Sequence, residues 1–231
     1  MAERPIFIPT PAAGLVEERS VEFEFFNGFS LTQKQRSIAS LHDAAQTAPD
    51  IHQILEVSRK SPNQNGPQLS AFNLDLSIGN GDGPITVEAA YQLSKVFPKH
   101  GPFPHMYKIR DGREIKKFIH QYNHDTLTGF HFNGQDWDLE PKTAFYDWLY
   151  LNAMRELARE KTELDDTLLS FNAFTDIEFN PKKSVNCQAR ACALYVSLLK
   201  LNILSDALAD ASSFITTLTQ HGYAVAQGKL L

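Results

Sequence analysis

The sequence has few cysteines and lacks the motifs that mark common metal and nucleotide sites. Its two cysteines, Cys187 and Cys192, form no CxxC pair, so we expect neither a disulfide framework nor a cysteine-ligated zinc site. Both lie in a mostly apolar stretch, which favours core packing over a nucleophilic role. The eight histidines form no HxH or HExxH motif, and we predict no metal site and no cofactor.

Long hydrophobic runs are also lacking. No apolar run approaches the roughly 18 residues that a membrane-spanning helix needs, and the proline-containing start, with Glu3 and Arg4, does not resemble a signal peptide. A net charge of −5 argues against a protein that coats DNA non-specifically. It leaves room for a local basic patch that holds one nucleotide or a short strand. We therefore expect a cytoplasmic protein.

The pattern of apolar residues predicts an α+β fold that is predominantly helical, with a few short strands in a single domain. We divide the chain into an extended segment over residues 1–19 that lies on the surface, one domain over residues 20–222, and a tail over residues 223–231. Strands are expected at residues 21–26, 69–78 and 174–179, and a hairpin at residues 129–139, where Asn133-Gly134 suits a type I′ turn. Helices are expected at residues 31–48, 85–97, 112–123, 141–161, 186–202 (capped by Asn186) and 206–220.

A polar stripe marks the predicted helix over residues 85–97. At about 100° per residue, Glu88, Gln92 and Lys95 fall on one face. A carboxylate, an amide and an ammonium group on one ridge can act as a base, an orienting group and an electrophile. The alternative is a solvated face that carries an ordinary Glu/Lys pair.

Four other residues have two interpretations each. Trp137, flanked by two acids, either stacks on a base or sugar or packs in the core. Tyr146 and Asp147 are either surface residues or supporting residues of a site. Lys34, in the first turn of its predicted helix, is by default solvated.

Several stretches together resemble a known family. TVEAAYQLSKVF (residues 86–97) resembles the signature helix of the NADAR family, T-x-E-H-x-x-Q-x-x-K-F, and LSAFNL (residues 69–74) resembles its L-S-N-F strand. EPKTAFYDWLY (140–150), FTDIEFNP (174–181) and NCQAR (186–190) resemble the NADAR antitoxins encoded beside DNA-targeting ADP-ribosyltransferase toxins of the DarT type. The resemblance covers roughly residues 20–204. The chain departs from the pattern at Ala89, where the motif has His, and has no clear match to a late acidic position near residues 180–183.

The resemblance implies a hydrolase that cleaves the N-glycosidic bond between ADP-ribose and the exocyclic amine of guanine in DNA. The implied partners are ADP-ribosylated DNA, presented single-stranded or with the guanine flipped out, the product ADP-ribose and a cognate toxin. Two alternatives remain: a hydrolase of free small N-glycosides of the riboflavin-pathway type, and a non-catalytic module that binds ADP-ribose or the toxin.

The resemblance also assigns roles to residues. Glu88, Gln92 and Lys95 occupy motif positions. We expect Glu88 as acid/base and Lys34 as a nucleophile that forms a Schiff base, with Lys95 on a phosphate or on Glu88. The predicted substrate-binding residues are Ser70, Asn73, Gln92, Trp137, Tyr146, Asp147 and Asn180. Two basic clusters are either solvated or hold phosphates: Arg110, Arg113, Lys116 and Lys117, and Lys182, Lys183 and Arg190.

Overall fold

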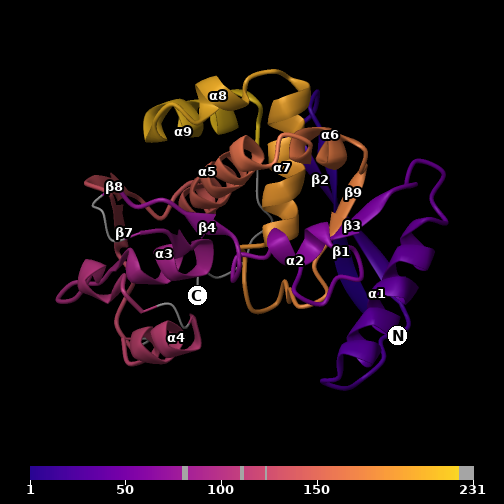
Figure 1. Cartoon of the computed structure of the whole chain (residues 1–231), viewed down its shortest axis with the longest axis horizontal. Coiled ribbons are helices and arrows are strands. Elements are labelled where there is room, and N and C mark those ends of the chain that lie inside the picture. Colours follow the sequence, from indigo (N-terminus) through magenta and orange to yellow (C-terminus); the bar gives the residue numbers. More distant parts are fainter. Residues whose placement is uncertain (80–82, 110–111, 123, 224–231) are drawn as a thin grey trace.

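A computed structural model describes residues 1–79, 83–109, 112–122 and 124–223, without the side chain of Arg113. Its first element is an antiparallel hairpin of β1 (Ala2–Thr10) and β2 (Leu15–Phe23), paired from Ala2↔Phe23 to Thr10↔Leu15 (Figure 1). Ile6 and Phe7 are completely or almost completely buried. The prediction that the first residues lie over the surface is therefore wrong, because their apolar side chains are covered on both faces of the hairpin. The strand predicted at residues 21–26 starts earlier, in β2.

The hairpin forms half of a four-stranded sheet with the order β2-β1-β9-β3. β3 (Ile54–Glu56) and β9 (Ala173–Thr175) are parallel neighbours, although they lie far apart in the sequence. α1 (Leu31–Ala45) covers one face with Ile38 and Leu41, and α7 (Gln188–Lys200) packs against β1, β2 and β9. The helix predicted from residue 31 is confirmed over residues 31–45, and Oγ of Ser30 caps it by accepting from the Gln33 amide.

The strand predicted over residues 69–78 is mostly wrong. After α2 (Asn65–Gln68), the chain turns, and the amides of Asn73 and Leu74 both donate to the carbonyl of Ser70. Only β4 (Asp75–Leu76) is a strand, and it pairs with β5 (Ile85–Thr86). Leu69, Ser70 and Ala71 are buried in succession in the turn, and exposed and buried side chains alternate only from Asn73 to Ile78.

The predicted helix over residues 85–97 is shorter than expected. α3 spans Val87–Leu93, and Lys95 begins β6 (Lys95–Val96), where it pairs with Phe130. β6 joins β7 (Gly129–Phe132) and β8 (Gln135–Trp137) in a three-stranded sheet. The hairpin turn is confirmed, since Asn133 and Gly134 have φ angles of 49° and 77°. These positive angles are those that a type I′ turn requires.

The remaining helices complete the core. α5 (Ala144–Glu160) agrees with its prediction and packs against α3 and α7, and α4 (Gly112–His120) packs against α3 (Figure 1). α6 spans Leu164–Leu169. α7 begins after Cys187, so the predicted cap at Asn186 is wrong, and the last predicted helix is divided into α8 (Leu204–Ala207) and α9 (Ala211–Gln220). The predominantly helical α+β class is confirmed.

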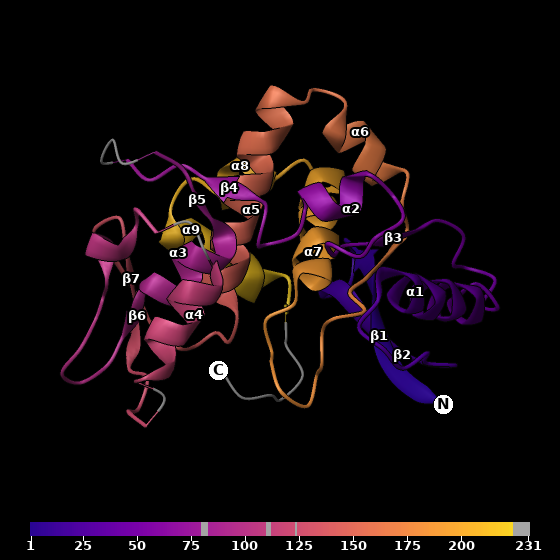
Figure 2. The same cartoon turned by 60° about the horizontal axis from the view of Figure 1, so that its bottom comes forward.

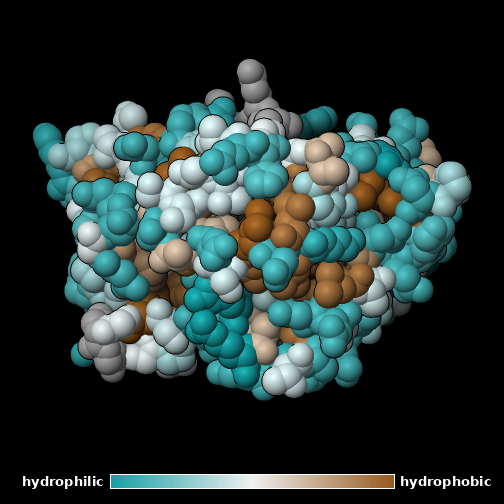
Figure 3. Space-filling view, turned by 90° about the horizontal axis from the view of Figure 1, so that it is seen from above, coloured by the Kyte–Doolittle hydropathy of each residue, from teal (hydrophilic) through white to brown (hydrophobic). Residues whose placement is uncertain are grey.

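The surface is mixed in character. Figure 3 shows one face, in which hydrophilic side chains surround smaller apolar areas. In the part of the chain that the structure describes, no helix combines the length and the apolar character needed to cross a membrane.

Candidate active site

A cavity of about 330 Å³ lies between α3, the start of α7 and the segment that joins β9 to α7. Figure 2 shows this joining segment looping out between α4 and the β1–β2 hairpin. Carboxylates, amides, aromatic rings and ammonium groups all line the cavity. The lining residues are Ser70, Ala71, Phe72, Glu88, Tyr91, Gln92, Lys116, Tyr146, Asp176, Glu178, Phe179, Asn180, Lys183, Ser184, Asn186 and Gln188.

Glu88 lies in the first turn of α3, where the helix start positions it. Oγ1 of Thr86 accepts from the Ala89 amide and caps the helix. Oε1 of Glu88 accepts a hydrogen bond from Nε2 of Gln92 at 3.1 Å and lies 2.9 Å from Nζ of Lys116. Glu88 is only 8% exposed. The prediction of one polar ridge therefore holds for Glu88 and Gln92, and the alternative of an ordinary solvated face is wrong for Glu88.

Lys95 is buried beside this pair, although it follows α3 rather than continuing it. Its Nζ lies 5.4 Å from the centroid of the Tyr91 ring. Burial lowers the pKa of Lys95 to about 8; the nearby carboxylate of Glu88 opposes this change, and the ammonium of Lys116 adds to it. A lysine with this pKa holds a useful fraction of free amine near neutral pH.

Lys34 has a different environment. It lies on α1, with Nζ 5.9 Å from the centroid of the Phe25 ring, and is half-buried. Neither Lys34 nor Lys95 is among the residues that line the cavity containing Glu88. Of the two lysines that the sequence suggests as nucleophiles, Lys95 is the one that is buried and interacts electrostatically with Glu88.

Two acidic residues that sequence reasoning missed enter the cavity directly after β9. Asp176 is 9% exposed, and its Oδ1 accepts from the amide of Glu178 at 3.0 Å. Burial and the neighbouring carboxyl of Glu56 raise the pKa of Asp176 well above its usual value. The sequence signal was present, because both acids belong to the FTDIEFNP block. It was missed because a longer strand was expected, whereas β9 ends at Thr175.

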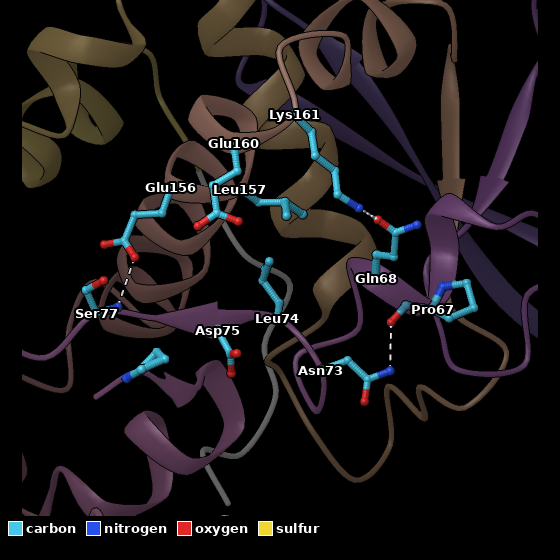
Figure 4. A pocket seen from close by; sticks show the side chains of 11 residues that line it. Pro67, Gln68, Asn73, Leu74, Asp75, Ser77, Glu156, Leu157, Glu160 and Lys161 are labelled. Atoms are coloured by element: carbon cyan, nitrogen blue, oxygen red, sulfur yellow. Dashed lines mark hydrogen bonds between the residues drawn. The ribbon is translucent and has the colours of Figure 1, made fainter. Parts of the chain in front are cut away.

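Four of the predicted substrate-binding residues meet in this cavity, namely Ser70, Gln92, Tyr146 and Asn180. Asn73 does not. It lines a second cavity of about 430 Å³, where its Nδ2 donates to the carbonyl of Pro67 at 2.9 Å (Figure 4). Asp75, Glu156 and Glu160 also line that second cavity, and their charge disfavours an anionic ligand.

Trp137 and Asp147 lie behind the cavity. Trp137 is 4% exposed, and its ring packs against those of Phe145 and Trp148 at centroid distances of 5.5 and 5.2 Å. Of its two interpretations, core packing is the one observed. Asp147 is completely buried, and its Oδ2 accepts from Oγ1 of Thr143 at 2.7 Å and from the hydroxyl of Tyr223 at 3.1 Å. Asp147 therefore supports α5 and does not line the cavity.

Cations surround the cavity mouth. Nζ of Lys116 and Cζ of Arg59 lie 4.8 and 4.6 Å from the centroid of the Phe72 ring, and Lys183 lines the wall. Arg190 is buried and donates to the carbonyl of Val185 at 2.9 Å, so it is not a surface phosphate ligand. Lys117 and Lys182 are exposed away from the lining. Arg110 and the side chain of Arg113 are outside the described residues.

The described residues bring no three His, Cys, Asp or Glu side chains together in a group that could hold a metal ion. Cys187 and Cys192 are both buried and unbridged, as core packing requires. Glu88 and Asp176 are buried acids that line the cavity, and Lys95 is buried beside Glu88 without being part of the lining.

Comparison with curated proteins finds no match. The family model described as "DarT1-associated NADAR antitoxin" matches residues 2–227, almost the whole chain. The chain belongs to the family of DarT1-associated NADAR antitoxins.

Proposed function

We propose that this antitoxin is a cytoplasmic hydrolase that cleaves the bond between ADP-ribose and the amino group of guanine in DNA, and so reverses the modification made by a cognate DarT1 toxin. The observation that carries the proposal is the buried Glu88 beside Lys95, whose pKa is lowered to about 8. Cleavage of a glycosidic C–N bond needs a nucleophile at the anomeric carbon and a proton for the departing amine. A carboxyl and an amine of low pKa supply both.

The nucleophile in this proposal is Lys95 rather than Lys34. The lone pair of Nζ bonds to the anomeric carbon as the bond to guanine breaks, and the departing amine takes a proton from a carboxyl group. The ring C–O bond then opens to give a Schiff base. Glu88 activates the water that hydrolyses this intermediate, which releases ADP-ribose and returns Lys95 as the free amine. The electrostatic interaction of Lys95 with Glu88, and the position of Lys34 beside Phe25 on α1, support the choice of Lys95.

The cations at the mouth suit a phosphorylated substrate. Lys116, Arg59 and Lys183 can contact phosphate oxygens of ADP-ribose or of the DNA strand. Enzymes that act on a base have to take it out of the stacked duplex or bind it in a single strand. We therefore propose that the modified guanine enters from single-stranded DNA or flipped out of a duplex.

The test compares two substrates at equal concentration: an oligonucleotide with one ADP-ribosylated guanine, and the corresponding ADP-ribosylated guanosine. Released ADP-ribose is followed by chromatography. We expect release from both, with the higher kcat/KM for the oligonucleotide. Equal values would favour a hydrolase of free small N-glycosides. Tight binding of ADP-ribose without any release would favour a non-catalytic module and overturn the proposal.

A further inference from the structure

A second buried carboxyl group lies directly behind the cavity. Glu56, the last residue of β3, is 1% exposed and pairs with Thr175 in the β3–β9 ladder. Its Oε1 accepts from Oγ of Ser58 at 2.6 Å and from the amide of Ile177 at 2.9 Å, and its Oε2 accepts from Oγ1 of Thr175 at 2.7 Å. Thr175 and Ile177 are the two chain neighbours of Asp176. One carboxylate thus binds the side chain of Thr175 and the backbone amide of Ile177, on the two sides of the acid that enters the cavity.

The two carboxyl groups also interact electrostatically. The carboxyl of Glu56 is a cause of the raised pKa of Asp176, second to burial. Among the described residues, no Lys or Arg forms an ion pair with either carboxyl. Two buried carboxyls without a cation cannot both ionise readily, so one keeps its proton near neutral pH.

Hydrogen bonding decides which carboxyl keeps the proton. Glu56 accepts three hydrogen bonds, all of which stabilise the ionised form. Asp176 accepts one from the Glu178 amide, at 3.0 Å. The hydrogen bonds therefore stabilise the carboxylate of Glu56 more than that of Asp176, and the proton belongs to Asp176.

We infer that Glu56 is a positioning residue for the reaction, which aims the Asp176 carboxyl into the cavity and keeps it in the acid form. In that form Asp176 is the proton donor to the departing guanine amine. The O–H bond of Asp176 breaks as the amine nitrogen gains the proton, and the resulting carboxylate regains it from solvent. This inference rests on the proposed function.

The other titratable groups around the pair do not replace this effect. They lie on α1, on the segment after β9, on α7 and on α5: His42, Glu178, Cys187, Cys192, Tyr146 and Tyr150. Burial lowers the pKa of His42 to about 4, so this ring, 2.8 Å from Oγ1 of Thr175, is neutral at pH 7. Burial raises the pKa of both cysteines and both tyrosines. Among these groups, Glu178 is the one that adds a charge, and its side chain is exposed.

The test follows the Asp176 carboxyl directly, by 13C NMR of protein labelled at the Asp side-chain carboxyl, with Asp176→Asn to assign the signal. In Glu56→Gln, the apparent pKa of Asp176 should fall by about 1–3 units, the range typical of a nearby charge. Glu178→Gln removes an exposed carboxylate instead and should give a smaller shift. Identical titration of Asp176 in Glu56→Gln and wild type, or a shift in Glu178→Gln as large as in Glu56→Gln, would overturn the inference.

Two additions keep the test decisive. If Glu56→Gln does not fold, Thr175→Val removes one donor to Glu56 with little change of shape, and should lower the Asp176 pKa in the same direction by less; no change would overturn the inference.

In hydrolysis assays, we expect activity to fall at alkaline pH as Asp176 loses its proton. In Glu56→Gln this fall should occur at lower pH than in wild type, because the pKa of Asp176 is lower in the variant. If wild type has no hydrolase activity, the proposed function fails, while the NMR titration still decides the role of Glu56.

Discussion

Lys116 and Glu88 form an ion pair that joins two helices at the cavity, with Nζ of Lys116 on α4 2.9 Å from Oε1 of Glu88 on α3. The side chain of Lys116 is 50% exposed and that of Glu88 only 11%. Lys116 therefore reaches the carboxylate from the solvent side. In the proposed reaction, a phosphate of the substrate would meet the ammonium first, and the same contact would orient the carboxylate behind it.

Lys116→Met should lower kcat/KM roughly tenfold, which corresponds to about 1.4 kcal/mol. The loss should appear chiefly as a higher KM, because a phosphate contact made equally in the ground state and the transition state affects binding. Steady-state kinetics on the ADP-ribosylated oligonucleotide measure it. Lys117→Met is the matched control on the same helix and should leave KM unchanged. If both changes raised KM equally, the effect would come from the overall charge of α4 and not from a specific contact of Lys116.

Glu88→Gln should reduce turnover by about 10²–10⁴, the range for loss of a general acid–base group. Gln has nearly the same shape, so thermal unfolding should change little. Single-turnover release of ADP-ribose measures the effect, and Glu114→Gln, an exposed acid on α4, is the control. Wild-type turnover in Glu88→Gln would remove Glu88 from the chemistry.

Borohydride reduction during turnover should link ADP-ribose covalently to the protein through Lys95. The adduct should be lost in Lys95→Met and retained in Lys34→Met, because only Lys95 is close to Glu88. Intact mass spectrometry detects it. Loss of the adduct in Lys34→Met alone would return the nucleophile to the lysine that the sequence resemblance favours.

The rate of adduct formation should rise with pH through about 8, because burial holds the pKa of Lys95 there and only the free amine attacks. Below that pH the ammonium form dominates and the rate falls. Lys116→Met removes a cation that lowers this pKa, so the midpoint should move to higher pH. Single-turnover rates between pH 6 and 10, within roughly two units of the pKa, measure it. A midpoint that does not respond to Lys116→Met would mean that another group titrates.

Trp137→Ala should destabilise the fold by about 3–5 kcal/mol, as expected for removing a large buried aromatic side chain. Trp137→Phe should cost less and leave kcat/KM of the folded protein unchanged, because the ring packs against Phe145 and Trp148 and does not line the cavity. Chemical denaturation and steady-state kinetics separate the two effects. If Trp137→Phe raised KM without changing the stability of the protein, Trp137 would instead stack on a base of the substrate.

Local signals in the sequence predicted the elements that depend on neighbouring residues. Asn133-Gly134 marked its hairpin because a type I′ turn depends on the turn residues themselves. The helix start at Leu31 was likewise predicted. The motif positions Glu88 and Gln92 were found, since one turn of helix brings them together.

Features that depend on distant contacts were not predicted. Burial and the carboxyl of Glu56 raise the pKa of Asp176, and Glu56 lies more than a hundred residues away in the sequence, paired with β9. No local pattern reports that pairing. The alternation over residues 69–78 gave no information on hydrogen-bond partners, so it could not distinguish a strand from a turning chain. Trp137 was ambiguous for the same reason, because its burial depends on α5.

The most direct measurement of the central claim is the intact mass of an oligonucleotide that carries one ADP-ribosylated guanine, before and after incubation with the protein. We expect the strand to lose the ADP-ribosyl group and return to the mass of unmodified DNA, with free ADP-ribose in solution. With Glu88→Gln, the strand should keep the mass of the modified oligonucleotide over the same incubation time. A strand that keeps its modification, or one that loses the whole base and leaves an abasic site, would contradict it.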